Sequence, residues 1–394
     1  MRARNFVLGL GSGLTAGYAF VRTLEALREW RCPSPLRAKD ATAYARIRRA
    51  FEVADTARAT VGFAAFSYGP VARYLDGATR PAPVWLRPAL YLTALSLVGT
   101  LADLPVAYVQ DYTLERRFGL SGQTQRDWLE EYVKSALLAA GLSGFLATLL
   151  GIAVRHAPRT WHWIASLALL PLFVAGNVIV PLYVLPLFNA FEPVTGSLEA
   201  RLRKLAGRYG VGDAAILRMD MSRQTRKANA FVTGIGQTHR IVLGDTLIGA
   251  FPEEEIEFVV AHELGHYVHK DVWRTIGLGE VLATLLLLAA NATSARDREE
   301  LRKRPLLILR IYAIMLLASQ ALRPLLFAFS RSREWAADRF AIVATGNPGA
   351  GASAFRRLRE QNLADEDPPS WYEFFFASHP SLRARIDALQ RARC

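Results

Sequence analysis

Two long stretches without charged residues constrain this chain more than any other feature. Residues 135–154 carry no charge between Lys134 and Arg155, and residues 160–191 contain no Asp, Glu, Lys or Arg. A helix of about 20 apolar residues is long enough to cross the hydrocarbon core of a bilayer. Both stretches reach that length, so the sequence predicts a multi-pass integral membrane protein with the lipid bilayer as a partner.

Five further segments have the length and apolar character of weaker spans. They lie at residues 6–21, 60–75, 88–109, 275–292 and 305–329. Charged residues within spans are costly and usually face a protein interior or a water-filled space, and Arg323 lies well inside the last segment. We therefore predict a mostly α fold, with a bundle of about seven transmembrane helices and a wet interior near Arg323.

The formal net charge of +13 raises the question of a nucleic-acid partner. The excess arginines are scattered over many loops, as expected beside anionic lipid headgroups, and no basic–aromatic module accompanies them. The cysteines, Cys32 and Cys394, make neither a disulfide framework nor a metal motif. We expect no nucleic-acid partner.

The segment EEEIEFVVAHELGHYVHKDVW carries the clearest chemical pattern. Its apolar residues recur at helical spacing, so His262 and His266, at i and i+4, project from one face of a helix. That geometry suits two corners of a tetrahedral zinc site, and Glu263 lies beside the first histidine, where it can act as the base for a water molecule. Gly265 would let another backbone approach closely. The structural alternative is a helix whose histidines only satisfy hydrogen bonds in the core.

A catalytic zinc site needs a third protein ligand. His269 is closest in sequence but lies about two helical turns beyond His262, so it is a poor third corner. Glu334, in SRSREWAADRFA, is the better candidate, with Asp338 at i+4 to accept a hydrogen bond from a ligand histidine. On spacing alone Glu334 could equally be a solvated carboxylate. Two predicted crossings separate His266 from Glu334, which returns the chain to the same side of the membrane.

These residues are similar to those of a known family. HELGH, SRSREWAADRFA and SHPSLRARI follow one another in the order found in the membrane-integral type I CAAX prenyl protease family, and PLFNAFEP, NAFVTG and RIVLGDTLI match it as well. The resemblance is strong from about residue 186 to the end and weak over the first 130 residues. It implies a zinc metalloendopeptidase with one Zn²⁺ per chain, and it supports Glu334 as the third ligand.

The resemblance also implies roles for residues outside the zinc motif. In that family the helices enclose a water-filled chamber, Asn229 and Ala230 would lie on an edge strand that binds an extended substrate, and His379 and Arg385 would face the scissile carbonyl. Purely structural roles are the alternatives for these residues. Asn229 could be a turn residue, His379 a capping residue before a proline-started helix, and Arg385 part of a solvated helix face.

We therefore expect four segments: a transmembrane region at 1–191 with about five spans, metallopeptidase parts at 192–274 and 330–394, and a transmembrane hairpin at 275–329. The two metallopeptidase parts together should form one small α+β domain, with short strands around a turn at Gly234 and Gly236. The predicted substrate is a peptide or protein, lipidated or otherwise associated with the membrane. A quality-control protease without prenyl specificity and an inert scaffold are the alternatives.

Two further expectations concern location. The alanine- and arginine-rich composition suggests a bacterial inner membrane. Basic residues are concentrated in the loops on the side of the zinc motif, so the positive-inside rule places the metal site towards the cytoplasm.

Overall fold

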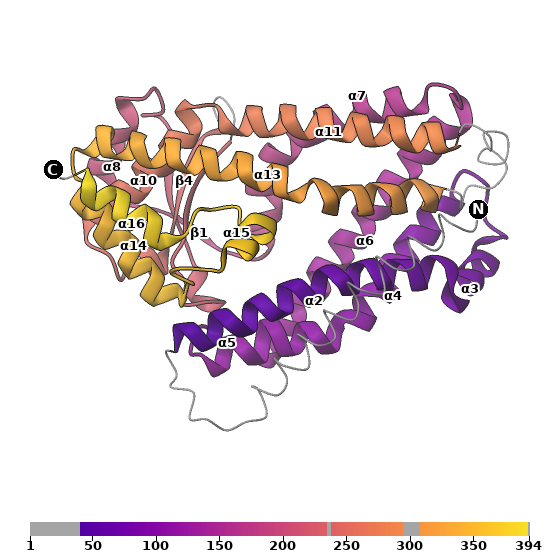
Figure 1. The fold of residues 1–394 in the computed structure, drawn as a ribbon, viewed down its shortest axis with the longest axis horizontal. Helices are drawn as coiled ribbons and strands as arrows, with labels where there is room; N and C mark the ends of the chain where they lie inside the picture. Colours follow the sequence, from indigo (N-terminus) through magenta and orange to yellow (C-terminus); the bar gives the residue numbers. More distant parts are fainter. Residues whose placement is uncertain (1–39, 235–237, 295–307, 393–394) are drawn as a thin grey trace.

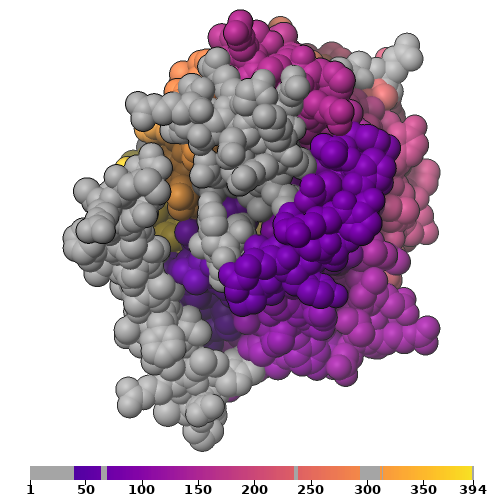
Figure 2. Space-filling model, turned by 90° about the vertical axis from the view of Figure 1, so that its right-hand side faces the viewer, coloured from indigo at the N-terminus to yellow at the C-terminus, as the bar shows by residue number. Residues whose placement is uncertain are grey.

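The computed structural model describes residues 40–234, 238–294 and 308–392. Long helices extend towards one end of the molecule, whereas a small sheet and shorter helices gather at the other (Figure 1). At the helical end, indigo-to-magenta helices of the N-terminal half lie beside one another, with orange parts of the C-terminal half across from them (Figure 2). The mostly helical fold with a small sheet is as predicted.

The N-terminal half is entirely helical within the described residues. Pro70 begins the second of its helices, and Thr124 caps α6 by accepting a hydrogen bond from the Asp127 backbone N–H. The elements are α2 (Ala41–Tyr68), α3 (Pro70–Thr79), α4 (Arg87–Ala107), the π-helical η1 (Tyr108–Thr113), α5 (Leu114–Arg117), α6 (Gln125–His156), α7 (Trp161–Ile179), the π-helical η2 (Val180–Val184) and the 3₁₀ turn η3 (Leu185–Leu187).

Four described helical stretches are long and apolar enough to cross a membrane. They are Arg87–Arg117, Gln125–His156, Trp161–Leu187 and Asp271–Ala292, and they coincide with four of the predicted spans. Residues 60–75 do not form one continuous helix, because α2 ends at Tyr68, Gly69 is extended and Pro70 has no N–H for an upstream carbonyl. The segment 6–21 lies outside the described residues.

The C-terminal half alternates strands and helices around two very long helices. A short strand at FEP, which the sequence did not reveal, opens this half. The elements are β1 (Phe191–Pro193), α8 (Ser197–Gly207), β2 (Ala215–Met219), the 3₁₀ turn η4 (Met221–Arg223), β3 (Ala230–Thr233), β4 (Arg240–Gly244), α9 (Asp245–Ile248), α10 (Glu253–Val268), α11 (Asp271–Ser294), α13 (Ile308–Thr345), α14 (Pro348–Asn362), α15 (Ser370–Phe376) and α16 (Leu382–Arg391).

The four strands form one sheet in the order β1-β2-β4-β3. Strands β2 and β4 are parallel, and β3 and β4 are antiparallel. The antiparallel pair agrees with the predicted strands around a turn at Gly234, whereas Gly236 lies outside the described residues. Gly234 has φ +93°, a conformation that favours glycine, and a Cβ there would lie 2.1 Å from the Thr238 carbonyl oxygen. Strand β3 is an edge strand of this sheet.

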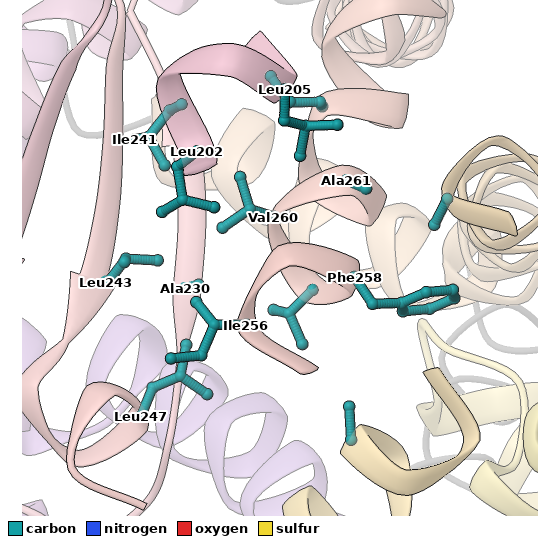
Figure 3. Packing of buried hydrophobic residues seen from close by; sticks show 14 of the residues in the cluster. Leu202, Leu205, Ala230, Ile241, Leu243, Leu247, Ile256, Phe258, Val260 and Ala261 are labelled. Carbon is teal, nitrogen blue, oxygen red and sulfur yellow. The ribbon is translucent and has the colours of Figure 1, made fainter. Parts of the chain in front are cut away.

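One apolar core joins the sheet to the helix that carries HELGH (Figure 3). Val260 of α10 lies beside Leu202 of α8, and Ile256 lies beside Ala230 of β3 and Leu247 of α9. All five side chains are buried. Full burial of such a side chain contributes about 1.5–3 kcal/mol. This core fixes one face of α10, so the opposite face is held towards α13.

Candidate metal centre

Helix α10 places the two motif histidines on the face that meets α13. It begins after Pro252 with Glu253, Glu254 and Glu255 in its first turn, where the helix dipole favours negative charge. The Nε2 atoms of His262 and His266 lie 3.2 Å apart, so both rings aim at one point. The helix therefore presents them as the spacing predicts.

Glu334 of α13 completes a cluster with these histidines. Its carboxylate lies 3.4 Å from His262 Nε2 through Oε2 and 3.3 Å from His266 Nε2 through Oε1. Ligands about 2.0–2.1 Å from a tetrahedral zinc ion are separated by about 3.3–3.4 Å, so the spacing of this nitrogen and oxygen set fits zinc. No other group of three or more metal-ligating side chains is found this close together among the residues that the structure describes.

The close approach of α10 and α13 depends on Gly265. A Cβ on this residue would lie 3.0 Å from the Cα of Ala337 and 3.2 Å from the Phe340 ring. Any larger residue would push α13 away and move Glu334 with it. The predicted function of this glycine, to allow another backbone close, is therefore confirmed by the structure.

The first histidine is held by a buried carboxylate and a buried arginine. His262 Nδ1 lies 2.8 Å from Asp338 Oδ1, the contact expected from the i+4 spacing of Glu334 and Asp338. Arg385 of α16 donates two hydrogen bonds to Asp338, at 2.8 and 2.6 Å, and its Nη1 lies 3.3 Å from Glu334 Oε2. Arg385 is only 6% exposed, so it does not belong to a solvated helix face.

The second histidine has a carboxylate and an arginine of its own, which sequence reasoning missed. His266 Nδ1 lies 3.0 Å from Asp271 Oδ2, and Asp271 accepts a 2.7 Å hydrogen bond from Arg333 Nε. Asp271 starts α11, just after a turn at Lys270, where φ is +55°. The only signals in the sequence were an acidic residue shortly after HELGH and an arginine next to Glu334.

These contacts set the protonation of the cluster. Burial alone would raise the pKa of the Glu334 carboxyl, but hydrogen bonds from His262 and His266 bring it well below its usual range. Burial would likewise raise the pKa of Asp338, yet the charge of Arg385 lowers it. Both carboxylates are thus held ionised, as metal and histidine partners require.

Glu263 lines the same cavity, of about 860 Å³, as the histidines. Removal from water raises the pKa of its carboxyl above the ordinary value, and the positive charges of His262 and His266 oppose that rise. A carboxyl group with a raised pKa beside a metal site is suited to accept and return a proton near neutral pH. The geometry agrees with its predicted role as a base.

Four other predicted site residues also line this cavity: Asn229, Ala230, His379 and Arg385. Ala230 begins edge strand β3, and the Asn229 carbonyl accepts a 2.9 Å hydrogen bond from Gly244 N–H.

His379 Nε2 lies 3.5 Å from Glu334 Oε1, with its side chain 62% exposed. Ser381 caps the N-terminus of α16, so His379 is not the capping residue there. His269, the rejected third ligand, instead contacts the Phe340 ring.

A helical membrane protein with two histidines and a glutamate converging beside a second glutamate has the characteristics of a metallopeptidase. The family model for Peptidase family M48 matches residues 193–393, and that for the CAAX prenyl protease N-terminal region, with five membrane helices, matches residues 34–190. The chain belongs to peptidase family M48 and is a metalloendopeptidase.

Relatives match across both halves of the chain. The metalloprotease YhfN of Bacillus subtilis is 29% identical over 341 residues, covering 80% of this chain and 78% of that protein. CAAX prenyl protease 1 of Saccharomyces cerevisiae is 27% identical over 322 residues, covering 76% and 71%. The crystal structure of S. mikatae Ste24p has the same fold, with a TM-score of 0.79 at 21% identity, covering 96% of this chain and 98% of that one.

Proposed function

We propose that this protein is a zinc metalloendopeptidase of the bacterial inner membrane that cleaves peptide bonds inside a chamber between its helices. The observation that carries the proposal is the convergence of His262, His266 and Glu334, whose ligand atoms all lie within 4.8 Å of one another, beside Glu263. The cavity supports a chamber, because it runs from this cluster to Thr56 of α2 and is lined by both halves of the chain.

A zinc ion held by His262, His266 and Glu334 would supply Lewis acidity to a water molecule and to the peptide carbonyl. Glu263 takes a proton from the water as its oxygen bonds to the carbonyl carbon, then gives it to the leaving nitrogen as the C–N bond breaks. His379 would donate a hydrogen bond to the carbonyl oxygen as negative charge develops there.

The remaining site residues would orient these groups. Asp338 and Asp271 accept from the Nδ1–H of the two histidines, so each ring presents its Nε2 to the metal. Arg385, which also lines the cavity, would act through its contacts with Asp338 and Glu334. Asn229 and Ala230 would bind an extended substrate as an additional strand along the edge of β3.

Substrates with prenylated C-termini are the first class to test. Their support is the similarity to CAAX prenyl proteases over both halves of the chain. The alternative is quality-control proteolysis without prenyl specificity. A relative whose name carries no prenyl specificity, the protease HtpX homolog of Acidiphilium cryptum, is 28% identical over 212 residues, 49% of this chain. Basic residues around the start of α6, on the side that contacts the C-terminal half, support a metal site that faces the cytoplasm: Arg116, Arg117, Arg126 and Lys134.

The test is cleavage of a fluorogenic farnesylated CAAX peptide by the detergent-purified protein, beside the same peptide without the lipid. Chelator-sensitive cleavage with a preference for the farnesylated peptide supports prenyl specificity. Equal cleavage of both peptides supports quality-control proteolysis. Zinc binding without cleavage of either peptide contradicts CAAX-type cleavage and favours a different substrate or a scaffold.

A further inference from the structure

Arg323 is the one charged residue inside a predicted span whose side chain reaches the active-site cavity. It lies on α13, eleven residues before Glu334, which corresponds to about 16 Å along a helix axis. Its Nη1 donates a 3.2 Å hydrogen bond to the Thr56 hydroxyl, and its guanidinium carbon lies 5.6 Å from the centre of the Phe376 ring. The wet interior that we expected near Arg323 is thus the cavity that is also lined by His262, His266 and Glu334.

The guanidinium of Arg323 has no carboxylate partner among the residues that the structure describes. A guanidinium has five N–H donors, and one hydroxyl and one aromatic face use only part of that capacity. A cation held deep within a bundle without a counter-charge is costly. Its environment therefore favours an anionic ligand.

The acidic groups that face Arg323 across the cavity already have partners. Glu52 accepts a hydrogen bond from the Tyr372 hydroxyl. Asp55 accepts from Gln110 at 3.1 Å and lies 2.9 Å from Arg58. The other arginine of the cavity wall, Arg385, is paired with Asp338. Asp365, also in this wall, is paired with Arg49. Of the two arginines that line the cavity, Arg323 is therefore the one whose charge is available to a ligand.

We propose that Arg323 binds the C-terminal carboxylate of the peptide substrate. The inference rests on the proposed protease function and adds to it a site that fixes how far from its C-terminus a peptide is cut. Arginine is suited to this task, because its planar fork can form two parallel hydrogen bonds with a carboxylate.

Distances in the structure limit the length of the fragment. The α13 backbone rises about 16 Å between Arg323 and Glu334. A substrate at about 3.3 Å per residue covers that length with about five residues beyond the bond that is cut.

The test compares one fluorogenic peptide as a free acid and as a C-terminal carboxamide, which differ only in that charge. We expect wild-type protein to have a KM for the acid lower by about tenfold or more, since a charge-assisted hydrogen bond is lost in the amide. In Arg323→Gln the KM of the acid should rise to that of the amide, whereas Arg323→Lys should keep part of the preference. Arg339→Gln, on the exposed face of the same helix, is the matched control and should keep all of it.

Binding separates this inference from the protease proposal. Affinity of both peptides for Glu263→Gln protein, with and without Arg323→Gln, is measured by fluorescence anisotropy. A preference for the acid that disappears with Arg323 supports the carboxylate site even if no peptide is cleaved. Cleavage of acid and amide with the same KM, or a preference that survives Arg323→Gln, overturns the site and leaves the protease standing.

Discussion

The two histidines of the metal centre are held by two arms of the same composition and different burial. In the first arm, His262, Asp338 and Arg385 are all 6% exposed or less. In the second, the side chains of His266 and Arg333 are 24% and 19% exposed, and only Asp271 is buried. In both arms a histidine contacts a carboxylate that accepts a hydrogen bond from an arginine. The contribution of this arrangement to stability and to metal binding depends on its access to water.

Burial decides what each arginine contributes. A buried ion pair that loses one partner leaves an uncompensated charge, whereas water can solvate the remaining charge of a more exposed pair. We therefore expect the first arm to contribute to the free energy of unfolding as well as to metal binding. The second arm should mainly orient its histidine. The following changes test this difference.

The largest effect is expected from Arg385→Met. It removes the cation shared by Asp338 and Glu334 and leaves both carboxylates buried. The free energy of unfolding of the metal-free protein should fall by about 3–5 kcal/mol. Arg333→Met is the matched change in the second arm and should cost about 1 kcal/mol, because water reaches that arginine. Thermal unfolding in detergent measures both, and equal losses would remove the distinction between the arms.

The carboxylates come next. Asp338→Asn and Asp271→Asn each exchange a charged acceptor for a neutral amide of the same size beside one ligand histidine. Zinc affinity should fall in both, by about 10–100-fold, with the larger loss for Asp338, whose arm is shielded from water. Competition with a chromophoric chelator gives both affinities. A larger loss for Asp271 would reverse the ranking of the two arms.

A smaller effect is expected from Gly265→Ala, which disturbs both arms together. The added methyl group would lie 3.0 Å from the Ala337 Cα, so α13 must shift away from α10 at a cost of about 1–3 kcal/mol. Gly277→Ala on α11 is the control, since a Cβ there meets nothing within 4 Å. Unfolding and zinc affinity are measured for both. An unchanged zinc affinity in Gly265→Ala would show that Glu334 tolerates the shift.

Much of the fold and the contact of His262 with Asp338 could be predicted from local patterns, whereas the pairing of Arg385 with Asp338 was not predicted. The i, i+4 histidines, the i+4 spacing of Glu334 and Asp338, and the glycine of HELGH each follow from helix geometry, and uncharged stretches define the longest spans. The predicted turn at Gly234 was confirmed for the same reason, because the residues that decide it are neighbours in sequence.

Features that depend on unusual backbone or on distant partners were not predictable. The second arm requires Lys270, a non-glycine residue, to adopt φ +55° so that Asp271 turns back towards His266. Strand β1 is only three residues long and ends in proline, which argues against a strand on pattern alone. The break at Gly69–Pro70 divides a segment whose hydropathy had suggested a single span.

If this chain is a zinc peptidase in which Glu263 moves the proton, loss of the Glu263 carboxylate should abolish cleavage and leave zinc bound. The test measures bound zinc and peptide cleavage together, for wild-type protein and for Glu263→Gln. We expect about one zinc ion in both proteins, held by His262, His266 and Glu334, and a loss of cleavage of about 10²–10⁴-fold or more in the variant. Full cleavage by Glu263→Gln, or wild-type cleavage that survives complete removal of zinc, would contradict this mechanism.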